Sequence, residues 1–81
     1  MRKADDAQLI QAAASEIKAR RGHADISQEE LAHRADVHRS FVARLELAQT
    51  QPSLAVFFRL SKALAVEPAE MVASIAKRLR R

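Results

Sequence analysis

Residues 27–32, Ser-Gln-Glu-Glu-Leu-Ala, mark the start of a helix more clearly than any other part of the chain. Ser27 and Glu30 have the spacing of a capping box, in which the side chain of each residue bonds the backbone N–H of the other. Ile26 and Leu31 flank this pair at the positions of a hydrophobic staple, which fixes the angle at which the chain enters a helix. We therefore predict that a helix starts at Ser27.

Hydrophobic periodicity and turn signals predict four further helices around this one. Asp36 separates the second helix from the third, Pro52 disfavours helix at the residue before it, and Pro68 suits the first position of the last helix. Asp5 or Asp6 is the expected N-cap of the first helix. The expected helices cover residues 5–21, 27–34, 38–47, 53–64 and 68–80. Their expected core-facing residues include Ile10, Ala13, Ala14, Ile17, Val42, Leu45, Leu54, Phe57, Leu60 and Leu64.

The composition agrees with one compact all-α domain over residues 1–81. The apolar residues are mostly Ala, Leu, Val and Ile, and a single Gly and only two Pro favour helix over sheet. The chain has no Cys, which excludes disulfides and thiolate metal sites and fits a cytoplasmic location. No apolar run approaches the roughly 20 residues of a membrane span, and we expect that the charged N-terminus is not a signal peptide. We therefore expect no membrane association.

The charge and the polar residues narrow the classes of function. The formal net charge is +4, from 14 basic and 10 acidic side chains, which is compatible with a polyanionic partner. The His residues have no metal-ligand spacing, no Ser/His/acid group stands out, and the chain has no glycine-rich phosphate loop. We therefore expect no enzyme activity, no metal, no cofactor and no small-molecule ligand.

The third predicted helix carries the residues that point to a function. With the second helix and the short turn between them, it has the anatomy of a helix-turn-helix, whose second helix enters the DNA major groove. At about 100° per residue, its apolar residues cluster on one side and its arginines on the other. Arg reads guanine through two hydrogen bonds, Ser donates or accepts, and an Ala methyl packs on a thymine methyl. The predicted base-reading residues are Arg39, Ser40, Ala43, Arg44 and His38. For His38 the alternative is that its side chain only caps the helix.

A set of residues between positions 17 and 72 forms a longer pattern in unbroken register. Its members are Ile17, Arg21, residues 27–32, Val37, Arg39, Ser40, Val42, Leu45, Glu46, residues 52–54 and residues 60–66. This pattern resembles the Cro/repressor helix-turn-helix family, often called the xenobiotic-response-element family. The overall length is similar to that of restriction–modification controller proteins and phage Cro-like repressors. The resemblance implies a five-helix lambda-repressor-like fold and a sequence-specific transcriptional regulator that binds double-stranded DNA.

The resemblance also implies roles for single residues outside the third helix. Arg21 and Glu46 match a partly buried ion pair that ties the first helix to the recognition helix. Such a pair fixes the register of two helices more than it stabilises them, and losing one partner costs several kcal/mol. The positions that match contacts with DNA phosphates are Ser27, Gln28, Gln49, Thr50 and Ser53, the last of which also caps the fourth helix.

The chain departs from the family at four turns where glycine is usual. These positions hold Asp25, Asp36, Ala48 and Ala65. A left-handed backbone costs Ala roughly 1 kcal/mol or more, whereas Asp tolerates it better. We therefore expect the third helix to run on by a residue or two near Ala48.

The last predicted helix carries an apolar stripe that indicates a second copy of the chain as a partner. Its first half can complete the core, whereas its second half extends beyond what a small domain can cover, unless it folds back on the long first helix. A homodimer would place two recognition helices about 34 Å apart on a palindromic operator. The predicted dimer contacts are Met71, Val72, Ile75 and Leu79. The basic residues that follow or interrupt the stripe, expected to complement the helix dipole, are Lys77, Arg78, Arg80 and Arg81.

A second class of function stays open at this point. The same fold also serves as a protein-interaction module, such as an antitoxin or a coactivator-like protein. Family members of that kind usually add a segment that binds the partner. The sequence shows no such segment beyond the last helix.

Overall fold

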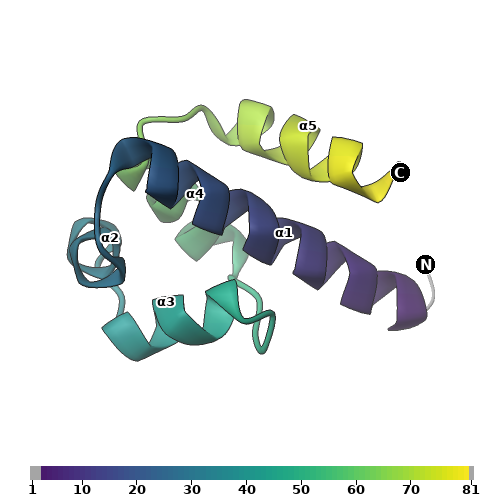
Figure 1. Cartoon of the computed structure of the whole chain (residues 1–81), viewed down its shortest axis with the longest axis horizontal. Helices are drawn as coiled ribbons and strands as arrows, with labels where there is room; N and C mark the ends of the chain where they lie inside the picture. The colour runs from purple at the N-terminus through teal and green to yellow at the C-terminus, as the bar shows by residue number, and fades with distance from the viewer. Residues whose placement is uncertain (1–2, 81) are drawn as a thin grey trace.

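Five helices make up the part of the chain that the computed structural model describes, residues 3–80, with side chains from residue 5 onward. They are α1 (Lys3–Ala24), α2 (Gln28–Ala35), α3 (Arg39–Glu46), α4 (Leu54–Ala63) and α5 (Pro68–Leu79). The long helix α1 crosses the molecule, with α5 along one side of it and α2 and α3 on the other (Figure 1). The all-α, five-helix prediction is confirmed, and none of these helices is long and apolar enough to cross a membrane. Arg81, the end of the predicted basic run, lies outside the described residues.

The core forms where an apolar face of each helix meets the others. Its largest fully buried apolar side chains are Ile17, Leu31, Val42, Leu45, Leu60 and Met71. The prediction that Leu54 faces this core is wrong, because Leu54 is 74% exposed. Leu54 is the first residue of α4, ahead of the buried stripe, and it lines an open groove beside α1 and α5. Ile10 lines the same groove and is only partly buried.

Side-chain caps define the starts of α2 and α4. The Oγ atom of Ser27 accepts the backbone N–H of Glu30 (3.0 Å), and the Oγ atom of Ser53 accepts the backbone N–H of Val56 (3.1 Å). The carboxylate of Glu30 accepts a hydrogen bond from Arg34 Nε (2.8 Å) instead of returning to the helix start to complete the capping box. The serine half of the box is therefore sufficient to begin α2 where the sequence predicts.

Helix α1 is longer than predicted at both ends. Asp5 and Asp6 lie in its first turn rather than at the N-cap, and their charges there complement the helix dipole. Gly22 stays helical and α1 ends only at Ala24. A single Gly costs a helix about 1 kcal/mol, which is too little to stop it. The stop comes at Asp25, where φ is 56°.

The ends of α1, α2, α3 and α4 share one left-handed turn. The residues with positive φ are Asp25 (56°), Asp36 (56°), Ala48 (60°) and Ala65 (58°), the four positions where the resembled family usually has glycine. After each of them, the next residue donates its N–H to the carbonyl five positions earlier, which is the Schellman motif. At three of the four ends that next residue is apolar and packs on the core, and these residues are Ile26, Val37 and Val66.

The remaining end, that of α3, corrects a prediction. α3 ends at Glu46 and does not run on near Ala48. The N–H of Gln49 donates to the carbonyl of Arg44 (2.9 Å), and the N–H of Ala48 donates to the carbonyl of Leu45 (3.1 Å). These bonds satisfy carbonyl groups at the helix end, which offsets the strain of a left-handed Ala.

Candidate nucleic-acid interface

Helices α2 and α3 and the turn between them form a helix-turn-helix on one side of the molecule (Figure 1). The turn covers residues 36–38 and begins with the left-handed Asp36. The N–H of Val37 donates to the carbonyl of Ala32 (3.0 Å), and its side chain packs against the core. Backbone and core contacts together therefore fix the direction in which α3 leaves the turn.

Helix α3 presents a polar face to solvent. Three of its predicted base-reading side chains are exposed, namely Arg39, Ser40 and Arg44, and Ala43 is half-buried. Val42 and Leu45 are fully buried on the opposite face and hold the helix on the core. Among the described residues, neither Arg39 nor Arg44 takes part in an ion pair. Both guanidinium groups are thus open to an external acceptor.

His38 occupies the N-cap position of α3, with extended backbone angles of −75° and 147°. Its side chain makes no capping hydrogen bond, so the alternative that the imidazole merely caps α3 is not what the structure shows. The backbone carbonyl of His38 accepts the N–H of Phe41 (3.0 Å). The imidazole is exposed beside the outward face of α3.

A buried ion pair holds α3 against α1. Arg21 Nε donates to Glu46 Oε2 (2.7 Å) and Arg21 Nη2 donates to Glu46 Oε1 (3.0 Å). Gln28 Nε2 donates to the same Oε1 atom (3.0 Å), and Arg21 Nη1 donates to the carbonyl of Ile26 (2.9 Å). Burial raises the pKa of Glu46, but the hydrogen bonds from Arg21 and Gln28 outweigh it, so the pKa lies below its ordinary value. The ion pair that the resemblance implies is therefore present.

The residues predicted to contact phosphates lie at the starts of two helices and in the loop before α4. Ser27 and Ser53 use their hydroxyl groups as N-caps, and Gln28 gives an amide N–H to Glu46. Gln49 is exposed and Thr50 is half-buried. Each helix start also offers backbone N–H groups, which bind phosphate well. These residues are thus exposed or half-buried, and the side chains of Ser27, Gln28 and Ser53 already use part of their hydrogen-bonding capacity inside the protein.

The comparison with protein families decides which class of protein carries this arrangement. The family model described as helix-turn-helix matches residues 17–71, which include the whole of α2, α3 and α4. The chain belongs to the helix-turn-helix family. It is a DNA-binding transcriptional regulator and not an enzyme. No curated protein sequence matches the chain.

Solved structures of similar proteins share this fold. The restriction-modification controller protein C.AhdI from Aeromonas hydrophila is 31% identical, with a TM-score of 0.74 over 76% of this chain and 94% of that one. The controller protein C.Esp1396I is 19% identical, with a TM-score of 0.84 over 90% of this chain and 96% of that one. The clp gene regulator ClgR from Corynebacterium glutamicum is 20% identical, with a TM-score of 0.81 over 85% of this chain and 73% of that one.

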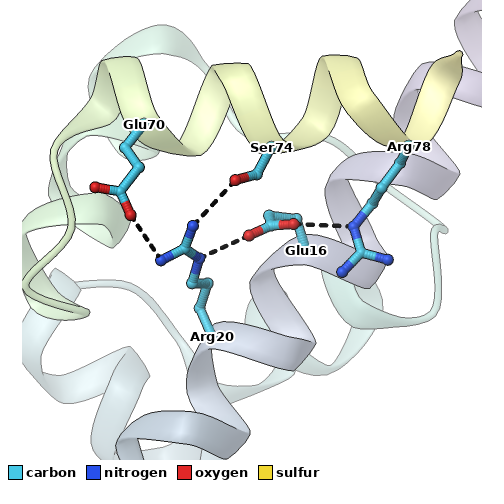
Figure 2. Close-up of polar contacts among 5 residues, drawn as sticks. All are labelled: Glu16, Arg20, Glu70, Ser74 and Arg78. Carbon is cyan, nitrogen blue, oxygen red and sulfur yellow. Dashed lines mark hydrogen bonds and ion pairs between the residues drawn. The ribbon is translucent and has the colours of Figure 1, made fainter.

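This helix-turn-helix protein also has a polar cluster that the sequence analysis does not find. We call it the Glu16 cluster, and its members are Glu16, Arg20, Glu70, Ser74 and Arg78 (Figure 2). Glu16 accepts hydrogen bonds from Arg20 Nε (2.6 Å) and from Arg78 Nε (2.9 Å). Arg20 also donates to Glu70 Oε2 (3.1 Å) and to Ser74 Oγ (3.0 Å), so the cluster joins α1 to α5.

The charge in the Glu16 cluster is stabilised where it lies. Burial raises the pKa of Glu16, but hydrogen bonds from Arg20 and Arg78 outweigh it, and the pKa lies below its ordinary value. The spacing of Glu16 and Arg20, four residues apart on one helix, is the only part of the cluster that a sequence pattern could have indicated. Arg78 therefore does more than complement the dipole of α5, which was its predicted role.

The structure narrows the predicted dimer contacts. Ile75 is 6% exposed and lines a groove at the surface. Met71 is fully buried, so it belongs to the core of the single chain and its assignment to a dimer contact is wrong. A side chain that its own domain already covers has no surface for a second copy. Val72 and Leu79 remain exposed, at 54% and 42%. Val72 lines an apolar groove of about 290 Å³ between α1, α4 and α5, together with Leu9, Ile10, Pro52 and Leu54.

Proposed function

We propose that the protein binds a palindromic site on double-stranded DNA as a homodimer and reads its sequence with α3. One observation supports this proposal more strongly than any other. The outward face of α3 holds two exposed arginines and a serine, none of which has a side-chain partner among the described residues. The opposite face of this helix is buried, and a buried ion pair ties the helix to α1. A short rigid helix with this face fits the major groove.

The chemistry of α3 sets the expected contacts with base edges. Arg39 and Arg44 each match the two acceptors of guanine, and Ser40 either donates or accepts. Ala43 lies between these side chains and can pack its methyl group on a thymine methyl. His38 stands at the start of the helix, where it can reach a base or a phosphate. The sequence reading would thus extend along α3 from its N-cap to Arg44.

The residues around α3 would hold the DNA backbone. Ser27 and Gln28 begin α2, Ser53 begins α4, and Gln49 and Thr50 lie in the loop between α3 and α4. Gln28 has two amide N–H groups, and Glu46 accepts one of them, which orients the amide for a phosphate at the other. Such contacts position the protein on the duplex without reading its sequence.

The homodimer would form through the apolar groove and the exposed side of α5. Leu54 and Val72 are large apolar side chains that the single chain leaves 74% and 54% exposed, and the groove lies between them. Burying this surface in a second copy would bring two α3 helices onto one face of the duplex, about 34 Å apart. Binding to genomic DNA would place the protein in the cytoplasm.

Selection of bound sites from random duplex DNA tests the proposal. We expect a palindromic consensus whose half-sites are separated by about one helical turn. On the selected site, Arg44→Ala should cost about 1–3 kcal/mol and on random duplex far less. Arg80→Ala, which removes an exposed charge at the end of α5, is the control. Equal losses for Arg44→Ala on both duplexes would show that Arg44 contacts only phosphate.

Light scattering on a sizing column tests the homodimer separately. We expect a dimer for the unmodified chain and a monomer for Val72→Glu, because a carboxylate in the apolar groove would be buried without a partner. His33→Glu, at an exposed position on α2, is the matched control and should leave the dimer intact. A monomeric unmodified chain at all concentrations that still selects a single half-site would contradict the dimer and leave sequence reading in place.

A further inference from the structure

A second groove lies between the end of α4 and the start of α5. It measures about 580 Å³, and we call it the basic groove, lined by Phe58, Arg59, Lys62, Val66 and Pro68 with Ala65 and Glu67. The connection from α4 to α5 lies on the opposite side of the molecule from α3 (Figure 1). The groove therefore lies on the α5 side of the molecule, and one of its lining residues, Arg59, also reaches the end of α2.

The apolar part of the basic groove centres on one ring. Of the three Phe side chains, Phe57 is buried in the core and Phe41 is partly buried against it, whereas Phe58 is 52% exposed. Val66 and Pro68 line the groove beside Phe58 and are themselves only partly buried. An exposed aromatic ring next to a hollow is a typical anchor point for a protein partner.

The polar part of the basic groove carries excess positive charge. Arg59 and Lys62 face one acid, Glu67, and within the described residues neither cation is in an ion pair. Arg59 Nε donates to the carbonyl of Ala35 (2.9 Å), which fixes the guanidinium group without neutralising it. A cation that is already held in place loses less side-chain freedom when it binds an anion.

We infer that the basic groove docks an acidic protein segment with an apolar or aromatic side chain as its anchor. The anchor would pack on Phe58, and carboxylates beside it would pair with Arg59 and Lys62. A duplex offers phosphates but no apolar anchor for Phe58, so DNA matches only half of this surface. The idea that the segment binds while α3 is on DNA rests on the proposed function, whereas docking itself does not.

Selection from a display library of random short peptides on the full-length chain tests the inference. Counter-selection on the double variant Phe58→Ser, Lys62→Glu removes peptides that bind elsewhere. We expect the enriched peptides to share acidic residues around an aromatic or large aliphatic residue. By fluorescence anisotropy, Phe58→Ser should weaken binding of a selected peptide about tenfold or more. Lys62→Glu should also weaken it, with an effect that shrinks as salt rises.

Two controls separate the groove from the rest of the molecule. Val72→Ser changes the apolar groove, and Lys77→Glu reverses an exposed charge of α5, and both should leave peptide affinity unchanged. Phe58 is already half exposed, so Phe58→Ser should keep the helical circular dichroism of the unmodified chain. The same variant should bind the selected DNA site with unchanged affinity. If site selection fails while peptide binding behaves as described, the proposed function fails and the groove assignment stands.

Four results would overturn the inference. One is enrichment of peptides without acidic residues, or no enrichment at all. Another is a selected peptide that binds the double variant as tightly as the unmodified chain. A third is conversion of a dimer into a monomer by Phe58→Ser, which would make the groove a contact between copies. A fourth is tight, Phe58-dependent binding of a single-stranded oligothymidylate, which would assign the ring to base stacking.

Discussion

Arg20 and Arg21 are neighbours in the sequence but hold opposite sides of the molecule together. They lie about 100° apart around α1, so their side chains leave the helix in different directions. Arg21 reaches α3 through both oxygens of Glu46. Arg20 reaches α5 through Glu70 and Ser74 while it pairs with Glu16 on its own helix (Figure 2).

The two sides differ in the number of ion pairs that tie each helix to α1. On the α3 side, one carboxylate that is 3% exposed depends on one guanidinium group, assisted by the amide of Gln28. On the α5 side, Glu16 has two guanidinium partners, Arg20 and Arg78, whose side chains are 22% and 31% exposed. Among its polar contacts with α1, α3 therefore depends on a single ion pair, whereas α5 depends on several contacts that can replace one another.

Among the substitutions that test this difference, loss of Arg21 should lower the free energy of unfolding most. Arg21→Ala leaves the carboxylate of Glu46 buried without a cation, and we expect a loss of about 3 kcal/mol in the free energy of unfolding. Arg20→Ala should cost about 1 kcal/mol, because Arg78 still pairs with Glu16. Urea denaturation of both variants measures the difference. Equal losses would show that the two sides are held in the same way.

Acid should affect both carboxylates, with the sign set by their pKa values. Glu16 and Glu46 have pKa values below the ordinary value of 4.5, so their stabilising effect is complete above that pH. It is lost as the pH falls below 4.5 and through the lowered pKa values. We expect Glu46→Gln to cost about 2 kcal/mol at neutral pH and to flatten the acid limb of a stability profile. Glu16→Gln should flatten the same limb, and an unchanged limb in both variants would contradict the assignment.

A double-mutant cycle tests whether Arg20 and Arg78 replace each other. Each single change to Ala should cost about 1 kcal/mol, because the remaining arginine still bonds Glu16. The double variant should lose more than the sum of the two, by about 1 kcal/mol, since Glu16 is then buried without a cation. Additive losses measured by thermal denaturation would refute the redundancy of the α5 side.

Glycine at the left-handed helix ends should change the free energy of unfolding least, and should raise it rather than lower it. Ala48→Gly on the α3 side and Ala65→Gly on the α5 side remove backbone strain and should each stabilise the fold by about 0.5–1 kcal/mol. Ala73→Gly, at an exposed position inside α5, is the control and should destabilise it by a similar amount. A loss of stability at Ala48 or Ala65 would show that the left-handed conformation is not strained there.

Local signals in the sequence predict most of the helices, because caps and turns act within a few residues. Ser27, Ser53 and Pro68 each mark a helix start that the structure confirms. The end of α3 was not predictable from the cost of a left-handed Ala alone, because the bonds of the Schellman motif offset that cost. Gly22 was wrongly predicted to end α1, because the free-energy cost of one Gly inside a helix is too small to end it.

The sequence predicts the part of the candidate site that lies on α3. The periodicity of α3 indicates its outward face, and family resemblance indicates the pair of Arg21 and Glu46. No local pattern connects Glu16 with Arg78, which lie 62 residues apart. Nor does a stripe on α5 show whether a residue such as Met71 packs inside the chain or against a second copy, because both environments are apolar.

The four left-handed helix ends have a consequence for the order in which the chain folds. Each Schellman motif closes between residues five positions apart, so a helix can stop at its proper residue before any tertiary contact forms. The bond between Arg78 and Glu16 closes a loop of 62 residues and has a larger entropic cost. We therefore expect the helices to form early and with defined lengths, and α5 to dock on α1 late. Substitution of Arg78 should then speed unfolding while leaving the folding rate nearly unchanged.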